Sequence, residues 1–268
     1  MYTFVTRVEF NGFCLDLRIV SCGRSPAPIN SCYLEGTIVS VPADHFLWAN
    51  RVRDEVVYVW NGTSIVPSDI KLDPLLPKPG CVVVVLESPH RSEYRVGPFE
   101  PIGPLRDPLS RNRLHEYLPR VLSKIGGIEK DTDIVICNPV PYQTSMDRIM
   151  VGYQKLQSPI RNAVWKALYT KGFQKDFESR ITAYKPSVIL NACTGGKSKW
   201  GLKETVRKTL IHLRAVEGVN SFRLITCSHH PSIWLVEPNF VEEKWFLSRI
   251  CGCPSVPGVC QVCGIRPL

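Results

Sequence analysis

The stretch C-V-V-V-V-L-E-S-P-H, residues 81–90, decides the fold, because a wholly apolar run ends abruptly in charged and polar residues. A strand that is apolar along its whole length is typical of a parallel sheet covered on both faces. Three similar runs follow: DIVIC (133–137), SVILNAC (187–193) and FRLITC (222–227). Helical candidates lie between the runs, at 111–125, 158–182 and 202–215. This alternation predicts an α/β fold, a three-layer α/β/α sandwich around a central, mostly parallel sheet.

Residues 1–76 follow a different pattern and are predicted to form a β-rich N-terminal addition. The segments YTFVTRVEF, LDLRIV and VVYVW are typical of strands, and Asn61-Gly62 after the last of them is a strong hairpin signal. A proline-rich connector, KLDPLLPKPG, ends this part. The sequence therefore predicts the addition at 1–76, an α/β domain at 77–248 and a cysteine-rich tail at 249–268.

The composition is that of a globular protein with a basic surface. The 268 residues include 33 Lys and Arg against 24 Asp and Glu, a formal net charge of +9. This charge favours nucleic acid over membrane as a partner, although an ordinary solvated surface can carry the same charge. Neither a bilayer-spanning run nor a signal-like start is seen, so we expect a cytoplasmic protein. The loop NACTGGK (191–197) lacks P-loop spacing, which argues against binding of a nucleotide triphosphate.

The sequence has 11 cysteines, many for a cytoplasmic protein. Several lie inside apolar runs, where cysteine acts as a small hydrophobic residue. Four lie close together in the tail: Cys251, Cys253, Cys260 and Cys263. Four thiolates can hold a structural zinc ion, but the first pair is C-x-C where C-x-x-C is usual. Disulfides and free thiols therefore stay as alternatives to a metal.

Polar loops follow three of the four apolar runs, at the end of the sheet where α/β proteins bind ligands. They read ESPH (87–90), NPVPYQTS (138–145) and SHHPSIW (228–234). Together they offer a carboxylate, a carboxamide and an imidazole. A carboxylate can orient water or stabilise an oxocarbenium-like sugar, an amide can read the edge of a base, and an imidazole can stabilise a departing base. The set therefore suits the removal of a flipped base from its sugar.

The three loops, in this order, resemble those of the uracil-DNA glycosylase superfamily. The similarity is greatest to its thermophile-type branch, whose first motif reads G-E-x-P-G and continues with G-R-P-F-x-G-x-x-G-x-L. Glu87 falls on the acid of that motif and Phe99 on its phenylalanine. Asn138 ends a strand where the superfamily has its base-reading asparagine, and residues 230–232 match its H-P-S loop. The resemblance covers roughly residues 80–245.

The resemblance implies a role for each residue. Glu87 would orient the attacking water and offset positive charge on the sugar, and His230 would stabilise the anionic leaving base. Phe99 would stack on the extruded base, and Asn138 would hydrogen-bond its Watson–Crick edge. Three further residues are expected to contact DNA: Ser88 and Ser232 at phosphates, and Trp234 as the wedge that enters the duplex. No cofactor is expected for catalysis.

Two departures from the family pattern bear on specificity and metal content. Leu86 replaces a glycine, and His90 stands where relatives carry glycine or a tyrosine that blocks substituents on pyrimidine C5. Without that tyrosine, His90 becomes a candidate substrate-binding residue and a C5-modified base can be admitted. The cysteines that hold an iron–sulfur cluster in the thermophile-type branch are not recognisable, so no such cluster is expected.

The sequence therefore predicts a monofunctional DNA glycosylase that leaves an abasic site. The excised base is predicted to be a C5-modified cytosine, such as the glucosylated hydroxymethylcytosine of phage DNA, which would make the enzyme an antiviral defence. Uracil, with a role in base excision repair, is a near-equal alternative. Two other hypotheses remain: a non-catalytic module that binds a modified base, and a zinc-dependent interaction domain centred on the tail.

Overall fold

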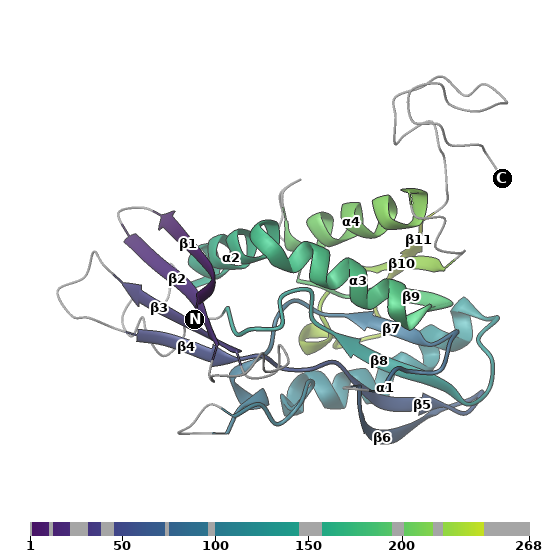
Figure 1. Ribbon diagram of the computed structural model, residues 1–268. Coiled ribbons are helices and arrows are strands. Elements are labelled where there is room, and N and C mark those ends of the chain that lie inside the picture. Colours follow the sequence, from purple (N-terminus) through teal and green to yellow (C-terminus); the bar gives the residue numbers. More distant parts are fainter. Residues whose placement is uncertain are drawn as a thin grey trace, which may run out of the picture.

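The computed structural model describes residues 2–10, 13–21, 32–38, 46–72, 75–95, 100–144, 157–194, 201–216 and 222–243. These residues form two sheets and four α-helices (Figure 1). The larger sheet has seven strands: β5 (Glu55–Trp60), β6 (Ile65–Lys71), β7 (Val82–Val85), β8 (Thr132–Cys137), β9 (Val188–Asn191), β10 (Arg223–Cys227) and β11 (Phe240–Glu242). Their spatial order is β11-β10-β9-β7-β8-β5-β6, with β10, β9, β7 and β8 parallel and the outer strands antiparallel. The expected α/β class with a parallel centre to its sheet is confirmed.

Helices pack against this sheet, and the alternation of its strands decides which residues meet which helix. The helices are α1 (Pro108–Ile125), α2 (Gln157–Leu168), α3 (Gln174–Tyr184) and α4 (Leu202–Val216). Val83 and Val85 of β7 share a core with residues of α2, α3 and α4, whereas Val82 and Val84 share another with residues of α1. The four valines are fully buried, and each contributes roughly 1.5–3 kcal/mol by leaving water. This burial on both faces is why the run at 81–86 is apolar throughout.

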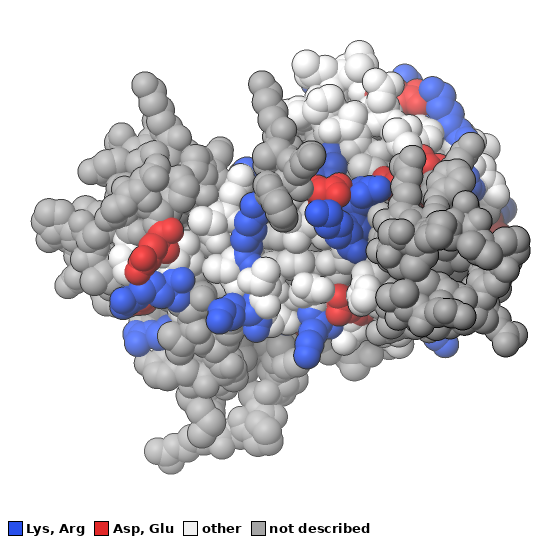
Figure 2. Space-filling view, turned by 90° about the horizontal axis from the view of Figure 1, so that it is seen from above, with Lys and Arg blue, Asp and Glu red and all other residues white. Residues whose placement is uncertain are grey.

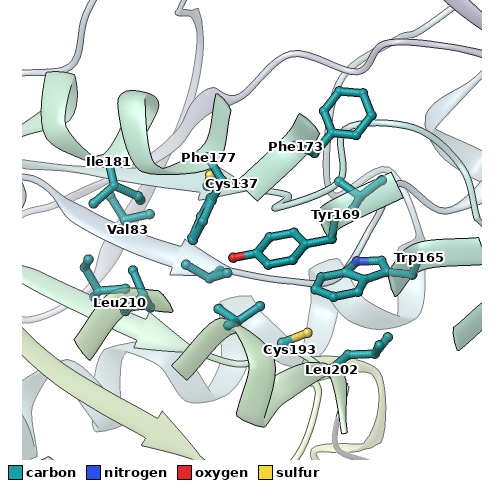
Figure 3. Close-up of a cluster of buried hydrophobic side chains, with 14 of the residues drawn as sticks. Val83, Cys137, Trp165, Tyr169, Phe173, Phe177, Ile181, Cys193, Leu202 and Leu210 are labelled. Carbon is teal, nitrogen blue, oxygen red and sulfur yellow. The ribbon is translucent and has the colours of Figure 1, made fainter. Parts of the chain in front are cut away.

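The core beneath α2 and α3 combines aliphatic side chains with a row of aromatic ones (Figure 3). Trp165 and Tyr169 stack with ring centroids 4.6 Å apart, and Phe177 packs beside Tyr169. A π-helical turn, Tyr169–Phe173, joins α2 to α3, so the two helices form one nearly continuous rod across the sheet. Trp165 lies at the end of this cluster, and its indole also bonds to the polar loop after β7. The aromatic core thus extends to the edge of the sheet where the polar loops lie.

The N-terminal addition contains a separate antiparallel sheet: β1 (Tyr2–Phe10), β2 (Phe13–Ser21), β3 (Cys32–Ile38) and β4 (Phe46–Asn50). The predicted hairpin at Asn61-Gly62 is present, between β5 and β6, and Gly62 has the positive φ of 101° that the turn requires. This hairpin is paired with β8 in the large sheet. Two strands of the large sheet, β5 and β6, therefore precede the boundary that the sequence predicts after residue 76.

The small sheet lies beside α2, close to the polar loops (Figure 1). Leu15 and Leu17 of β2 are buried in the same core as Trp165. After β4, the backbone N–H of Val52 donates to the carbonyl of Pro141 at 2.9 Å, in the loop that follows β8. The addition is therefore attached to the edge of the large sheet that carries the candidate site. None of the helices in the described residues is both long and apolar enough to cross a bilayer.

Candidate active site

The carboxyl ends of the four parallel strands place the predicted site residues along one edge of the sheet. Asn138 follows β8, Glu87 follows β7 and His230 follows β10, with Thr194 after the intervening strand β9. Neighbouring strands lie about 4.8 Å apart, so β7 and β10 are roughly 10 Å apart. The strand order reverses between β7 and β9, because β8 lies on one side of β7 and β9 on the other. Such a switch point opens a crevice at the carboxyl ends of the strands.

Glu87 is a buried carboxylate at this switch point, with only 6% of the residue exposed. Its Oε1 atom lies 3.2 Å from Nε of Arg161 on α2, and its side chain hydrogen-bonds with Thr194 from across the crevice. Its backbone carbonyl accepts a 2.8 Å bond from the indole N–H of Trp165. Burial raises the pKa of Glu87, while the charge of Arg161 and the bond with Thr194 oppose that rise. Glu87 is therefore held by contacts to both its main chain and its side chain.

Asn138 carries a buried oxygen without a hydrogen-bond partner among the residues that the structure describes. The residue is only 2% exposed, and its Oδ1 accepts no hydrogen bond from the residues that the structure describes. A buried acceptor left unpaired costs about 1–3 kcal/mol, so a native structure rarely keeps one without a reason. The backbone carbonyl of Asn138 accepts a 3.0 Å bond from Arg180, whose guanidinium also pairs with Asp54 at 2.6 Å. The main chain is thus fixed while the amide oxygen stays available.

His230 is half-buried and is held in one tautomer. Its Nδ1 accepts the backbone N–H of Ser232 at 3.2 Å and lies 2.9 Å from the hydroxyl of the same residue. The neutral ring then carries its proton on Nε2 and can donate a hydrogen bond there. Burial, and next the charge of Lys203, lower the pKa of His230 to about 4, although Asp107 opposes them. The imidazole is therefore neutral at pH 7.

His90 repeats this arrangement on the loop after β7. Its Nδ1 accepts the backbone N–H of Ser92 at 3.3 Å and lies 2.7 Å from the hydroxyl of Ser92. Unlike His230, this imidazole is exposed. Asp107 caps α1 by accepting from Ser110 and also interacts with both histidines. Burial acts to raise the pKa of Asp107, but the bonds from Ser110 and, after them, the two histidines lower it below its usual value. Two imidazoles and one carboxylate from three elements thus lie near each other at the site.

The two serines predicted to bind phosphate are engaged within the protein. The hydroxyl of Ser88 lies 2.8 Å from that of Thr144, a bond that ties the loop after β7 to the loop after β8. The hydroxyl of Ser232 contacts His230. Their proposed contact with DNA stays a prediction, while their contacts in the structure position the loops.

The prediction that Trp234 is the wedge that enters the duplex is wrong. The residue is 2% exposed, packs in the core shared with α1, and donates its indole N–H to the carbonyl of His229 at 3.0 Å. Its large apolar ring is more stable in the core than at the surface, and sequence spacing could not distinguish the two positions. Its neighbours in the chain are exposed instead, Leu235 by 72% and Val236 by 73%.

Five predicted residues lie outside those that the structure describes: Phe99, Cys251, Cys253, Cys260 and Cys263. The base of the segment that carries Phe99 is described, and its two arms pair between Tyr94 and Pro101. A buried Glu93 anchors it by accepting the N–H of Leu105 at 2.9 Å. Within the described ranges, no group of three or more His, Cys, Asp or Glu is arranged to hold a metal ion.

Arg161 and Trp165 are site residues that the sequence reading missed. They lie four residues apart on α2, so both project from the same face of the helix toward the loop after β7. The available signal was the segment RNAVW in a helical candidate, with a cation and an aromatic residue one turn apart. That signal is weak, because only the tertiary structure brings α2 against Glu87.

Comparison of the chain with models of known families, with curated proteins and with solved structures finds no match. The function is therefore inferred from the site: a buried carboxylate, an amide with a free oxygen and a neutral imidazole on one edge of a sheet.

Proposed function

We propose that the protein is a monofunctional DNA glycosylase related in its site to the uracil-DNA glycosylase superfamily, and that its α/β part is a three-layer sandwich of that type. The observation that carries the proposal is the buried, unpaired Oδ1 of Asn138, on the same edge as Glu87 and His230. An extruded pyrimidine supplies the missing donor, N3–H of uracil or N4–H of cytosine. Pairing it removes the cost of the unsatisfied oxygen, so base binding is favoured only when the correct edge is presented.

The three side chains divide the reaction between them. Ionised Glu87 orients a water molecule toward C1′ and stabilises positive charge on the sugar as the bond from C1′ to the base nitrogen breaks. The electron pair of that bond leaves with the base, whose developing negative charge is stabilised by the Nε2–H of His230. A neutral imidazole suits this role because it donates a hydrogen bond from Nε2. A charged imidazole could instead transfer a proton to the carboxylate of Glu87. Water supplies a hydroxyl group to C1′, and its proton passes to Glu87.

The reaction is proposed to stop at the abasic site. A lyase step needs an amine that can attack C1′. Lys203 is the lysine that acts electrostatically on His230, and its ammonium group donates to the carbonyls of Cys227 at 2.6 Å and Ser228 at 3.0 Å. These bonds hold the amine against the backbone and support a purely hydrolytic reaction.

DNA is the proposed partner, and an apolar tip replaces Trp234 as the proposed wedge. Ile233, Leu235 and Val236 are exposed in the loop that carries His230, and apolar side chains of this kind can separate stacked bases. Lys and Arg side chains lie in several groups on the face above α2–α4, with acidic side chains beside them (Figure 2).

Leu235→Ser should weaken binding to duplex DNA and leave the melting temperature unchanged, and unaltered binding would exclude Leu235 as the wedge.

The base is proposed to be a C5-modified cytosine, with uracil as the second candidate. Asn138 alone does not distinguish them, because its oxygen accepts from either ring. Exposed His90, in place of a blocking tyrosine, favours the larger base. A glucosyl group has hydroxyls that an Nε2–H donor can bind.

Alkali-induced cleavage of end-labelled DNA tests the function directly. Parallel duplexes would contain uracil, hypoxanthine, 5-hydroxymethylcytosine or its glucosylated form. Glu87→Gln, which keeps the size of the side chain and removes its charge, should lower the rate at least about a hundredfold while DNA binding persists. Cleavage at uracil alone would assign the repair role. Silence on every duplex, with base-specific binding retained, would instead favour a non-catalytic module.

A further inference from the structure

The structure places one cation directly against the buried carboxylate of the site. Arg161 reaches Glu87 from α2, with Nε 3.2 Å from Oε1, and its guanidinium is itself oriented by Asn162, whose Oδ1 lies 3.2 Å from Nε and 3.1 Å from NH2. One turn further along α2, Trp165 binds the main-chain carbonyl of Glu87. A single helix thus fixes the backbone of Glu87 and faces its carboxylate with a permanent positive charge.

We propose that Arg161 is a positioning residue that keeps Glu87 ionised and aims its carboxylate at the reacting sugar. This inference rests on the proposed function, because only a reaction at the sugar needs Glu87 as an anion. It adds a residue from outside the three polar loops. Arg161 acts through Glu87 and need not touch the substrate.

The physical reason is the burial of Glu87, which is only 6% exposed. Removing a carboxylate from water favours its neutral, protonated form, and a neutral acid can neither attract a proton from water nor stabilise a cationic sugar. Burial is the larger effect on the pKa of Glu87, and the nearby charge of Arg161 opposes it. Such an attraction is stronger where water is scarce. An arginine is suited to this task because its guanidinium stays charged even when it is partly buried.

Among the described residues, the other groups that act on Glu87 do not supply this charge. Thr194, from the segment after β9, contributes a neutral hydrogen bond. Cys193 beside it interacts with Glu87, but burial raises the pKa of this thiol well above its usual range, so it stays neutral. The same guanidinium also acts on His230, where it favours the neutral imidazole. One cation therefore favours the anionic acid and the neutral histidine that the proposed reaction requires.

The test compares Arg161→Met with Arg161→Lys in the full chain. We expect Arg161→Met to lose at least about tenfold in excision rate at neutral pH and to recover as the pH rises, because the acid limb of its pH profile moves upward. Arg161→Lys keeps a cation and should keep the acid limb close to that of the wild type. A rate that falls equally at every pH would overturn the proposal, since a structural or DNA-binding role would have that effect.

A second measurement does not depend on activity. Glutamate labelled with carbon-13 at its carboxyl group reports ionisation by NMR, and the signal absent from Glu87→Gln identifies Glu87. We expect this signal to titrate at a higher pH in Arg161→Met than in the wild type, with Arg161→Lys between them. Identical titration in all three proteins would overturn the inference. A shifted titration in a protein that excises no base would support the pairing and reject the proposed function. If Arg161→Met does not fold, Arg161→Gln removes the same charge with a polar side chain and gives the comparison.

Discussion

The loops after β7 and β10 use the same local device in two different environments. Each has a histidine followed two residues later by a serine, and in each the backbone N–H of that serine donates to Nδ1 of the histidine. The tautomer is therefore set locally and is the same in both. Burial differs, because His90 is exposed while His230 is half-buried near Lys203. The comparison teaches that a short motif can fix where a proton sits, whereas the surroundings decide whether the ring is charged.

Each of the two loops also carries a titratable group that burial holds in its neutral form. On the first loop, burial raises the pKa of Glu93 to about 8, and on the second, burial lowers the pKa of His230 to about 4. Near pH 7 both groups are mainly uncharged. The two loops are consequently sensitive to pH in opposite directions, although they lie on the same edge of the sheet.

The largest expected effect separates His230 from its exposed neighbour His229 by activity. His230→Ala should lower the excision rate about a hundredfold to ten-thousandfold, because the departing base loses its hydrogen-bond donor. His229→Ala, which changes the exposed neighbour, is the matched control and should stay close to the wild-type rate. Single-turnover kinetics with saturating enzyme measures both. Equal losses in the two variants would show that His230 has no special role.

The next effect is on stability and separates the loops by pH. Glu93 favours the folded state most at low pH, and this contribution is lost as the pH rises from about 4.5 through 8, on the order of 5 kcal/mol. The contribution of His230 has the opposite sign, because its folded pKa is lowered from 6.5 to about 4. Stability is therefore lost as the pH falls through this interval, about 3 kcal/mol at most.

Denaturant unfolding at several pH values measures these slopes. Glu93→Gln should flatten the alkaline side of the stability profile, and His230→Ala should flatten the acid side. Each variant is the control for the other. A variant that flattens both sides of the profile, or neither side, would contradict the assignment of the alkaline slope to Glu93 and of the acid slope to His230.

The smallest effect concerns the two serines, Ser92 and Ser232, whose hydroxyl groups contact Nδ1 of the histidines. Ser232→Ala and Ser92→Ala each remove a hydroxyl next to Nδ1 but keep the backbone N–H that defines the tautomer. We expect each to lose only about 1 kcal/mol of stability. Ser232→Ala should also slow excision by roughly tenfold, because His230 is placed less firmly. Measuring the excision rate and a melting curve on the same variant separates this effect from the loss of stability. A slower Ser92→Ala enzyme on glucosylated DNA alone would place His90 at the modified base.

The sequence predicted the parallel centre of the sheet well, because the reason is local and repeated. Val82–Val85 and the three later apolar runs are predicted to be buried on both faces, and the central strands of a covered parallel sheet provide that. The hairpin at Asn61-Gly62 was predictable for a similar reason, since few residues accept a positive φ. The position of this hairpin in the large sheet was not predictable, because pairing with β8 joins residues far apart in the chain.

For the site, the sequence by itself determined which chemical groups follow which strand: Glu87, Asn138 and His230 after three of the four apolar runs. The tertiary structure alone decided their state. It buried Glu87 against Arg161, left the oxygen of Asn138 unpaired among the described residues, and moved Trp234 from the expected surface into the core. The physical reason is that burial and the nearness of charges depend on packing between distant segments, whereas the identity of a side chain and its place after a strand are properties of the local sequence.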